Sequence, residues 1–186
     1  MIRNRLSILL AERGIKATKV ANDTGIARST LSKITSNSSE KIDYSTINTL
    51  CRYLKITPCD FFEYEPFDVS FFVSLEKTYT EDNVLFYYDI EAFMNIYDAD
   101  GKHTVEYTGF FELDGNGYFA FYVEPASNDD VNLVDMYLHD VSQTFITDIT
   151  TKFKTKIIHV ANETGNYDIS MNDHITINLF DKKKTS

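Results

Sequence analysis

The sequence predicts a chain of two domains, an all-α N-terminal domain followed by an α+β C-terminal domain. Apolar residues recur at helical spacing before Pro66 and at every second position after it. The charges divide as well: residues 1–57 hold ten basic and four acidic side chains, a net charge of +6, which leaves −16 for the rest of the chain. We therefore expect domains at 1–66 and 67–186, with a basic and an acidic surface that suit different partners.

In residues 1–66 the pattern predicts a bundle of five short helices. Ser45 is a candidate N-cap for the fourth helix. Thr57, Pro58 and Asp60 offer an N-cap, a proline at the first helical position and an acid at the third, which predicts the start of the fifth helix. The apolar face of the bundle is assigned to Ile2, Leu6, Leu9, Leu10, Val20, Ala21, Thr24, Leu31, Ile34, Ile47, Leu50, Cys51 and Leu54.

After Pro66, aromatic-rich alternation predicts a run of strands. Residues 67–75 and 86–97 carry the clearest alternation. Turn signals at 98–101 and 114–117 then join the second run to 103–113, and that run to 118–123, as consecutive hairpins. The expected arrangement is an antiparallel meander.

The end of the chain predicts one helix packed on this meander. Residues 128–130 are Asn-Asp-Asp and favour a helix start, and an apolar stripe continues over 131–153. Residues 157–160 and 175–180 are expected to be closing strands, and the three lysines at 182–184 a solvated tail. The predicted C-terminal fold is thus an antiparallel β meander with one packed helix.

Residues 19–34 have the spacing of two helices joined by a tight turn. Ala21 allows the helices to cross closely, Gly25 suits a turn with positive φ, and Ile26 fills the space between the helices. The core positions of this unit are expected to be Val20, Ala21, Gly25, Ile26, Leu31 and Ile34. The second helix then presents Arg28, Ser29, Thr30 and Lys33 outward.

This segment resembles the Cro/CI-type (XRE) helix-turn-helix family of phage and bacterial regulators. The resemblance covers about residues 1–65, includes the closing pattern 49–58, and implies a five-helix, lambda-repressor-like DNA-binding domain. Two positions depart from the family: Ala17 stands where a Gln is common, and Ala27 stands where a Ser or Thr often caps the second helix.

The resemblance implies that the helix at 28–36 enters the major groove of double-stranded DNA. Base reading is expected from Arg28, Ser29, Thr30 and Ser32, with Arg28 the strongest discriminator through a guanine contact. Contacts to the DNA backbone are expected from Lys16, Thr18, Lys19, Lys33, Asn37, Ser38 and Lys41. The implied function is that of a repressor from a phage or another mobile element, which binds a two-fold operator as a homodimer.

Several other classes of protein are not expected. The four histidines lie in four different elements without ligand spacing, and no Walker or dinucleotide motif occurs, so we predict no enzyme, no metal and no cofactor. Residues 98–101 do not fit a calcium loop and predict a hairpin turn. Two cysteines, no signal peptide and no apolar run of spanning length favour a cytoplasmic protein that is not in a membrane.

Three roles remain open for the acidic domain. It could form the dimer, it could bind a ligand and alter the spacing of the DNA-binding domains, or it could bind and inhibit a host protein as a DNA mimic or anti-CRISPR-like module. Four aromatic residues, Phe72, Tyr87, Phe93 and Tyr97, fall on the sheet face opposite to the main apolar one. They either pack in the domain or mark a partner surface.

Overall fold

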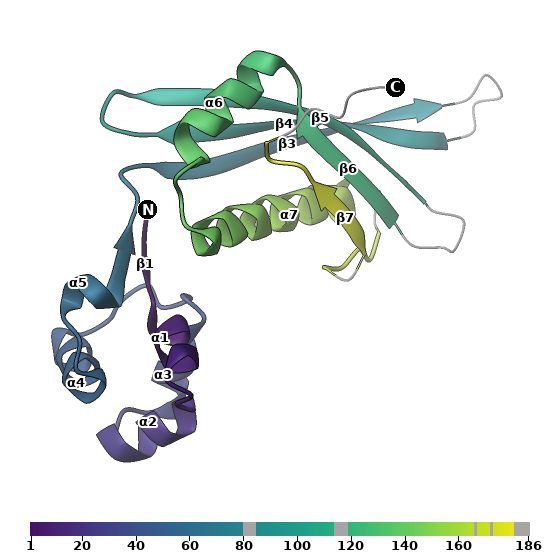
Figure 1. Cartoon of the computed structure of the whole chain (residues 1–186). Helices are drawn as coiled ribbons and strands as arrows, with labels where there is room; N and C mark the ends of the chain where they lie inside the picture. Colours follow the sequence, from purple (N-terminus) through teal and green to yellow (C-terminus); the bar gives the residue numbers. More distant parts are fainter. Residues whose placement is uncertain (80–84, 114–118, 166, 172, 181–186) are drawn as a thin grey trace. The chain divides into compact units, whose positions relative to one another are not determined.

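The computed structural model describes residues 1–79, 85–113, 119–165, 167–171 and 173–180. The backbone divides into two compact units, Met1–Pro66 and Phe67–Ser186. In chain order the first unit contains β1 (Ile2–Asn4), α1 (Leu6–Glu12), α2 (Ala17–Thr24), α3 (Arg28–Thr35), α4 (Tyr44–Leu54), α5 (Pro58–Phe61) and β2 (Phe62–Tyr64). Figure 1 labels all of these except β2.

Mostly aliphatic side chains form the core of the first unit. Leu6, Leu50 and Phe61 are completely buried, and they come from α1, α4 and α5. The other buried members are Leu9, Leu10, Val20, Ala21, Leu31, Ile34, Cys51 and Leu54. Each short helix therefore contributes one apolar face, as the spacing of these residues predicts.

A two-stranded antiparallel ribbon joins the two ends of this unit (Figure 1). Ile2 pairs with Tyr64, and both side chains are about 70% exposed. The assignment of Ile2 to a helical apolar face is therefore wrong, because residues 2–4 pair with a strand about 60 positions away. An ion pair across the ribbon joins the guanidinium of Arg5 to the Glu63 carboxylate, with Nε and Oε1 3.1 Å apart.

The helix starts follow two patterns. The side chain of Thr57 accepts from the Asp60 N–H and the Asp60 carboxylate accepts from the Thr57 N–H, so the predicted capping box of α5 is confirmed. The N-cap of α4 is Asp43, and the prediction of Ser45 as the cap is wrong by two residues. Asp43 adopts an extended backbone, whereas Ser45 already lies within the first turn of the helix.

The second unit contains a five-stranded sheet and two helices. Its elements are β3 (Asp68–Tyr79), β4 (Leu85–Tyr97), β5 (Lys102–Leu113), β6 (Phe119–Pro125), α6 (Asn128–Leu138), α7 (Gln143–Gly165) and β7 (His174–Ile177). The strand order is β3-β4-β5-β6-β7, antiparallel except for the β6–β7 pair. The antiparallel meander is confirmed, and the parallel closing strand is an addition to it.

Two helices, rather than the one predicted, pack on the sheet. The predicted strand at 157–160 is wrong, because these residues belong to α7. Ile157 continues a stripe that includes Phe153 and Ala161 at a spacing of four residues, and burial of this stripe overrides the strand preference of a β-branched run. The predicted strand at 175–180 is confirmed only in part, since β7 ends at Ile177.

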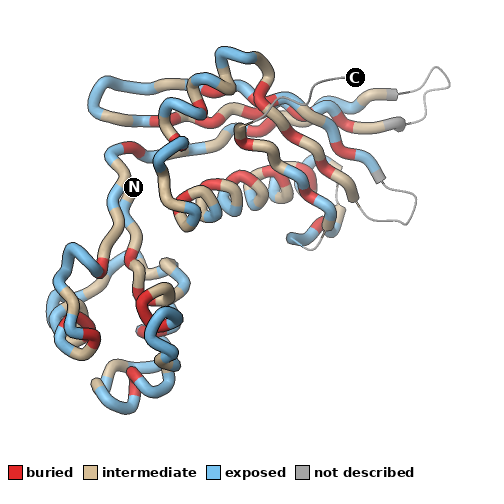
Figure 2. Tube along the Cα trace, in the orientation of Figure 1, coloured by how far each residue is buried: buried red, intermediate tan, exposed pale blue. Residues whose placement is uncertain are grey.

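Both helices cover the same face of the sheet. The ring of Phe153 in α7 stacks on Phe71 of β3 at 4.5 Å between centroids, and Tyr137 of α6 contacts His103 of β5 at 5.4 Å. The strand register places Phe71 and His103 on one face. Figure 2 shows the buried positions alternating with exposed ones along the strands, so the opposite face is open to solvent.

The turn at 98–101 is a hairpin turn, as predicted. One carboxylate oxygen of Asp98 accepts from the N–H groups of Asp100 and Gly101, and Gly101 has a φ of 138°. The predicted turn at 114–117 and the predicted tail at 182–184 lie outside the described residues.

Candidate nucleic-acid interface

A tight turn joins α2 to α3 at Gly25. This residue has a φ of 75°, and its N–H donates to the Ala21 carbonyl at 2.9 Å. A Cβ at this position would meet no atom within 4 Å, so the backbone conformation rather than lack of space favours glycine here. The Thr24 hydroxyl donates to the Val20 carbonyl and accepts from the Ile26 N–H. The turn is therefore held by its own residues.

Helix α3 has one buried and one open face. Leu31 and Ile34 are fully buried against the core, and Ile26 packs beside it. The side chains proposed from the sequence to read bases or phosphates on this helix, Arg28, Ser29, Thr30, Ser32 and Lys33, are all exposed. The helix therefore presents a row of polar side chains from a rigid support, as reading a groove requires.

Among the described helices, α2, α3 and α4 begin with N-cap residues whose own side chains form no cap hydrogen bond. Their N-cap residues are Lys16, Ala27 and Asp43, whereas α5 and α6 are capped by Thr57 and Ser127. The first N–H groups of a helix attract anions, because they carry the positive end of the helix dipole. Phosphate oxygens of DNA suit these positions.

Lys19 is held by an intramolecular network. Its Nζ lies 2.8 Å from the Asp23 carboxylate, which also accepts from the Tyr53 hydroxyl at 2.7 Å. The hydrogen bond to Asp23 raises the pKa of Lys19, and the bond from Lys19 lowers the pKa of Asp23. A phosphate contact by Lys19 would thus share this cation with Asp23, unlike contacts by the exposed Lys16 and Lys41.

Asn37 is used within the protein. Its Oδ1 accepts from the main-chain N–H and the Nδ2 of Asn4, and its own Nδ2 donates to the Asn4 carbonyl. Asn4 is 4% exposed, and it also donates to the Ile34 carbonyl at the end of α3. This pair fixes the loop after α3 to β1, so we no longer expect Asn37 to bind phosphate; Ser38 beside it is exposed.

The Asn4–Asn37 pair was missed in the sequence, since two isolated asparagines 33 positions apart give no local signal. Asn37 has a φ of 52°, which asparagine tolerates better than most residues. The hydrogen bonds of this pair hold the loop after α3, at the end of the candidate interface, against β1.

A family model for the Cro/C1-type HTH DNA-binding domain matches residues 5–66. Residues 5–66 are a Cro/C1-type helix-turn-helix domain. No curated protein and no solved structure matches the chain. The helix-turn-helix domain contains the α2–turn–α3 unit and supports a DNA-binding regulator, and the match ends where the backbone divides into two units.

Outside the helix-turn-helix domain, His103, His139 and His159 each lie beside a different acid. His103 lies 3.5 Å from Asp98, and His139 lies 3.3 Å from Asp135. Within the described residues, no three His, Cys, Asp or Glu side chains are placed to hold a metal ion. The same part of the chain contains no helix long and apolar enough to cross a membrane.

Proposed function

We propose that the chain is a sequence-specific transcriptional repressor that binds a two-fold operator as a homodimer. The observation that carries the proposal is the exposed polar face of α3, anchored from behind by Leu31 and Ile34 within a Cro/C1-type domain. Repression, and an origin in a phage or another mobile element, follow from the resemblance of residues 1–65. The role is one of binding, without a catalytic step or a cofactor.

Helix α3 is proposed to lie in the major groove. Arg28, at its first position, suits a bidentate contact to guanine O6 and N7, a contact that contributes about 1–3 kcal/mol of discrimination. The hydroxyls of Ser29, Thr30 and Ser32 would read further base edges. Lys33 and Lys41, with the open N-termini of α2 and α4, would hold the phosphates on either side.

The full-length protein tests this function by fluorescence anisotropy on labelled DNA from upstream of its own gene. We expect tighter binding to that DNA than to a random duplex, and a steep loss of affinity for both as salt increases. Arg28→Ala should weaken binding to the preferred DNA more than to the random duplex. The matched control is Arg52→Ala, which removes the same charge from an exposed position on α4. An equal loss for both DNAs with Arg28→Ala would refute base reading by this residue.

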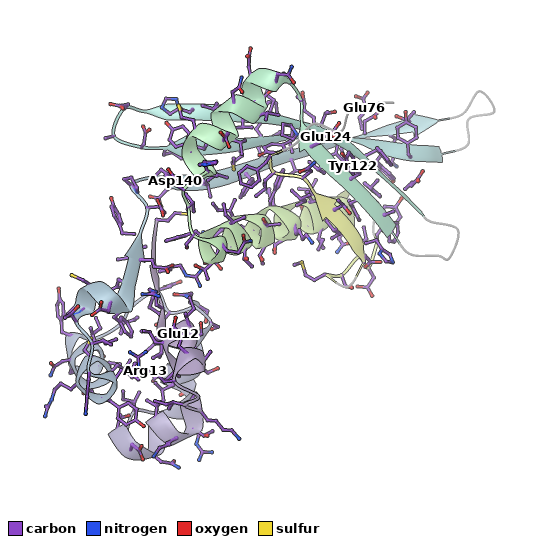
Figure 3. All side chains as sticks on the ribbon, in the orientation of Figure 1. Glu12, Arg13, Glu76, Tyr122, Glu124 and Asp140 are labelled. Carbon is purple, nitrogen blue, oxygen red and sulfur yellow. The ribbon has the colours of Figure 1, made fainter. Side chains whose placement is uncertain are left out.

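A second role is proposed for the open face of the sheet, from a specific cluster of carboxylates. Glu76 of β3 is the cross-strand partner of Asp89, and Glu91 is the next residue of β4 on the same face. Glu106 of β5 lies diagonal to Glu91, since its own partner is Phe93. Together with Ser74 and Thr108 they line a shallow hollow of about 420 Å³. Figure 3 labels Glu76 at one side of the sheet and Tyr122 and Glu124 on β6.

Aromatic rings occupy neighbouring positions on the same face of the sheet. Phe72 contacts Phe93 at 6.1 Å between ring centroids, and Tyr87 contacts Phe110 at 6.3 Å. Among the described residues, none of the four carboxylates forms an ion pair. Carboxylates and aromatic rings together suit arginine and lysine side chains, so the favoured occupant is a basic surface of another protein.

A fluorescent peptide of alternating arginine and alanine tests the second role against the full-length protein. The triple variant Glu76→Gln, Glu91→Gln, Glu106→Gln should lose most of the binding. The control triple variant Asp135→Asn, Asp140→Asn, Glu163→Gln makes the same change in charge at exposed positions of and beside the helices, and should keep it. Equal losses in both triples would mean that the peptide responds only to net charge.

A further inference from the structure

The long edge strand of the sheet has an unpaired side. β3 runs over 12 residues and pairs with β4 on one side only. Within the described residues, no backbone hydrogen bond from a turn or loop reaches the part of this strand that follows Asp68. An edge of this length leaves several N–H and C=O groups available to another strand.

The two edges of the sheet differ in how they are protected. The opposite edge, β7, has only four residues. β3 contains no proline, and its pairing with β4 is regular until the shift at Thr78 and Tyr79. Proteins protect an edge with prolines, bulges, charges or a covering helix. From Val69 to Leu75 β3 carries none of the first three, and α7 packs on one face of the strand, where Phe153 stacks on Phe71.

Side chains along this edge are incompletely covered. Val69, Phe71 and Leu75 face the helix layer but are only partly buried, whereas the cross-strand partners Ile96, Met94 and Ile90 on β4 are at most 2% exposed. On the open face, Phe72 is 56% exposed. A further strand beside β3 would cover these four apolar side chains and pair its backbone at the same time.

We propose that β3 pairs antiparallel with β3 of a second copy of this chain, so that two five-stranded sheets join into one sheet across a two-fold axis. The proposal rests on the dimeric operator binding proposed above and names the surface that makes the dimer. When the same strand of two copies pairs antiparallel, a two-fold axis relates the copies. A two-fold operator requires the same symmetry.

Two registers of this pairing differ in which side chains lie opposite one another, and one of them avoids opposed like charges. Centred on Val73, it sets Phe71 opposite Leu75 of the second copy, Phe72 opposite Ser74, and Ser70 opposite Glu76. Val69 then lies opposite Lys77, whose aliphatic stem can pack on it, and no like charges are opposed. Centred on Phe72 instead, the pairing would set Asp68 opposite Glu76, which is unfavourable.

A second copy fits this edge better than it fits the open face. An isologous contact through the open face would bring the hollow lined by Glu76, Asp89, Glu91 and Glu106 close to its own copy. Like charges opposed without counter-ions are repulsive. Pairing at the edge leaves that face free for a basic partner.

Sedimentation equilibrium of the full-length protein, without DNA, tests the proposal. We expect a reversible dimer. Ser70→Glu should weaken it, on the order of 2- to 30-fold in dissociation constant, because two symmetry-related glutamate pairs with Glu76 would form. Adding Glu76→Lys to that variant should restore the dimer, since each new glutamate would then face a lysine.

Matched variants separate register from general charge. Ser70→Lys should leave the dimer intact or tighten it. Thr104→Glu adds the same charge on the same face of β5, an internal strand, and should leave dimerisation unchanged. A monomer at all concentrations, or a dimer weakened by Ser70→Glu and not restored by Glu76→Lys, would overturn the proposal. Either result could coexist with sequence-specific DNA binding, which the anisotropy experiment measures separately.

Discussion

The two units of the chain are stabilised in different ways. In the first unit, mostly aliphatic side chains from short helices surround one core, and a pair of asparagines fixes the loop after α3. In the second, aromatic rings stack between strands: the ring of Phe111 lies 4.3 Å from Tyr88 and 4.7 Å from Phe121 between centroids. The ring of Phe71 also stacks on Phe153 of the long helix α7. The first unit presents a polar helix anchored on its core, and the second has an open sheet face and a long edge strand, to which we assign the proposed protein contacts.

The difference shows which kinds of contact a sequence reveals. The α2–turn–α3 unit depends on residues within about 16 positions, so Gly25, Leu31 and Ile34 predict it from the local sequence alone. The hairpin at Asp98 and the capping box at Thr57 are equally local. By contrast, the β1–β2 ribbon joins residues about 60 positions apart, and neither strand is long enough to show alternation.

Helix α7 shows why local preference fails when packing opposes it. Residues 157–160, Ile-Ile-His-Val, have strand propensity, but Ile157 is fully buried on the same stripe as Phe153. Burial of that stripe on β3 contributes more than the propensity of three β-branched residues costs. The parallel β6–β7 pair also depends on contacts more than 50 positions apart. In the candidate interface, the exposed α3 residues were predictable, and the internal use of Asn37 was not.

The largest expected effect is destabilisation of one unit while the other stays folded. Phe111→Ala removes a fully buried ring that stacks on two others, and should lower the free energy of unfolding of the second unit by about 3–5 kcal/mol. Calorimetry should show that only one transition shifts. Phe61→Ala, the matched variant in the first unit, should shift only the other. If either variant moved both transitions together, the two units would not unfold independently.

A smaller effect should come from the asparagine pair. Asn4→Ala leaves the amide of Asn37 without its buried partner and should destabilise the first unit by about 1–3 kcal/mol. Thermal unfolding measures the loss, and Asn22→Ala, on an exposed face of α2, is the control with little effect. An unchanged midpoint with Asn4→Ala would mean that this pair does not support the loop after α3.

The smallest expected effect is the contribution of a single carboxylate, Asp98, to the pH dependence of the stability of the second unit. The hydrogen bond from Tyr137 holds the pKa of Asp98 below its ordinary value of 3.8. A lowered pKa contributes stability above pH 3.8, and this stability is lost as the pH falls through the folded-state value. Asp98→Asn should therefore flatten the acid side of the thermal-midpoint profile of the second unit. An acid profile that keeps its slope in this variant would assign the loss to other carboxylates.

Selection of DNA from a random duplex library, with the full-length protein and its Arg28→Ala variant side by side, tests whether the protein reads a two-fold operator through α3. We expect enrichment of a two-fold sequence whose half-sites lie about one helical turn, roughly 10 base pairs, apart. In the variant, the preference should relax at one base pair in each half-site. If no sequence were enriched, or if the variant enriched the same sequence with the same preference at every position, base reading by α3 would be refuted.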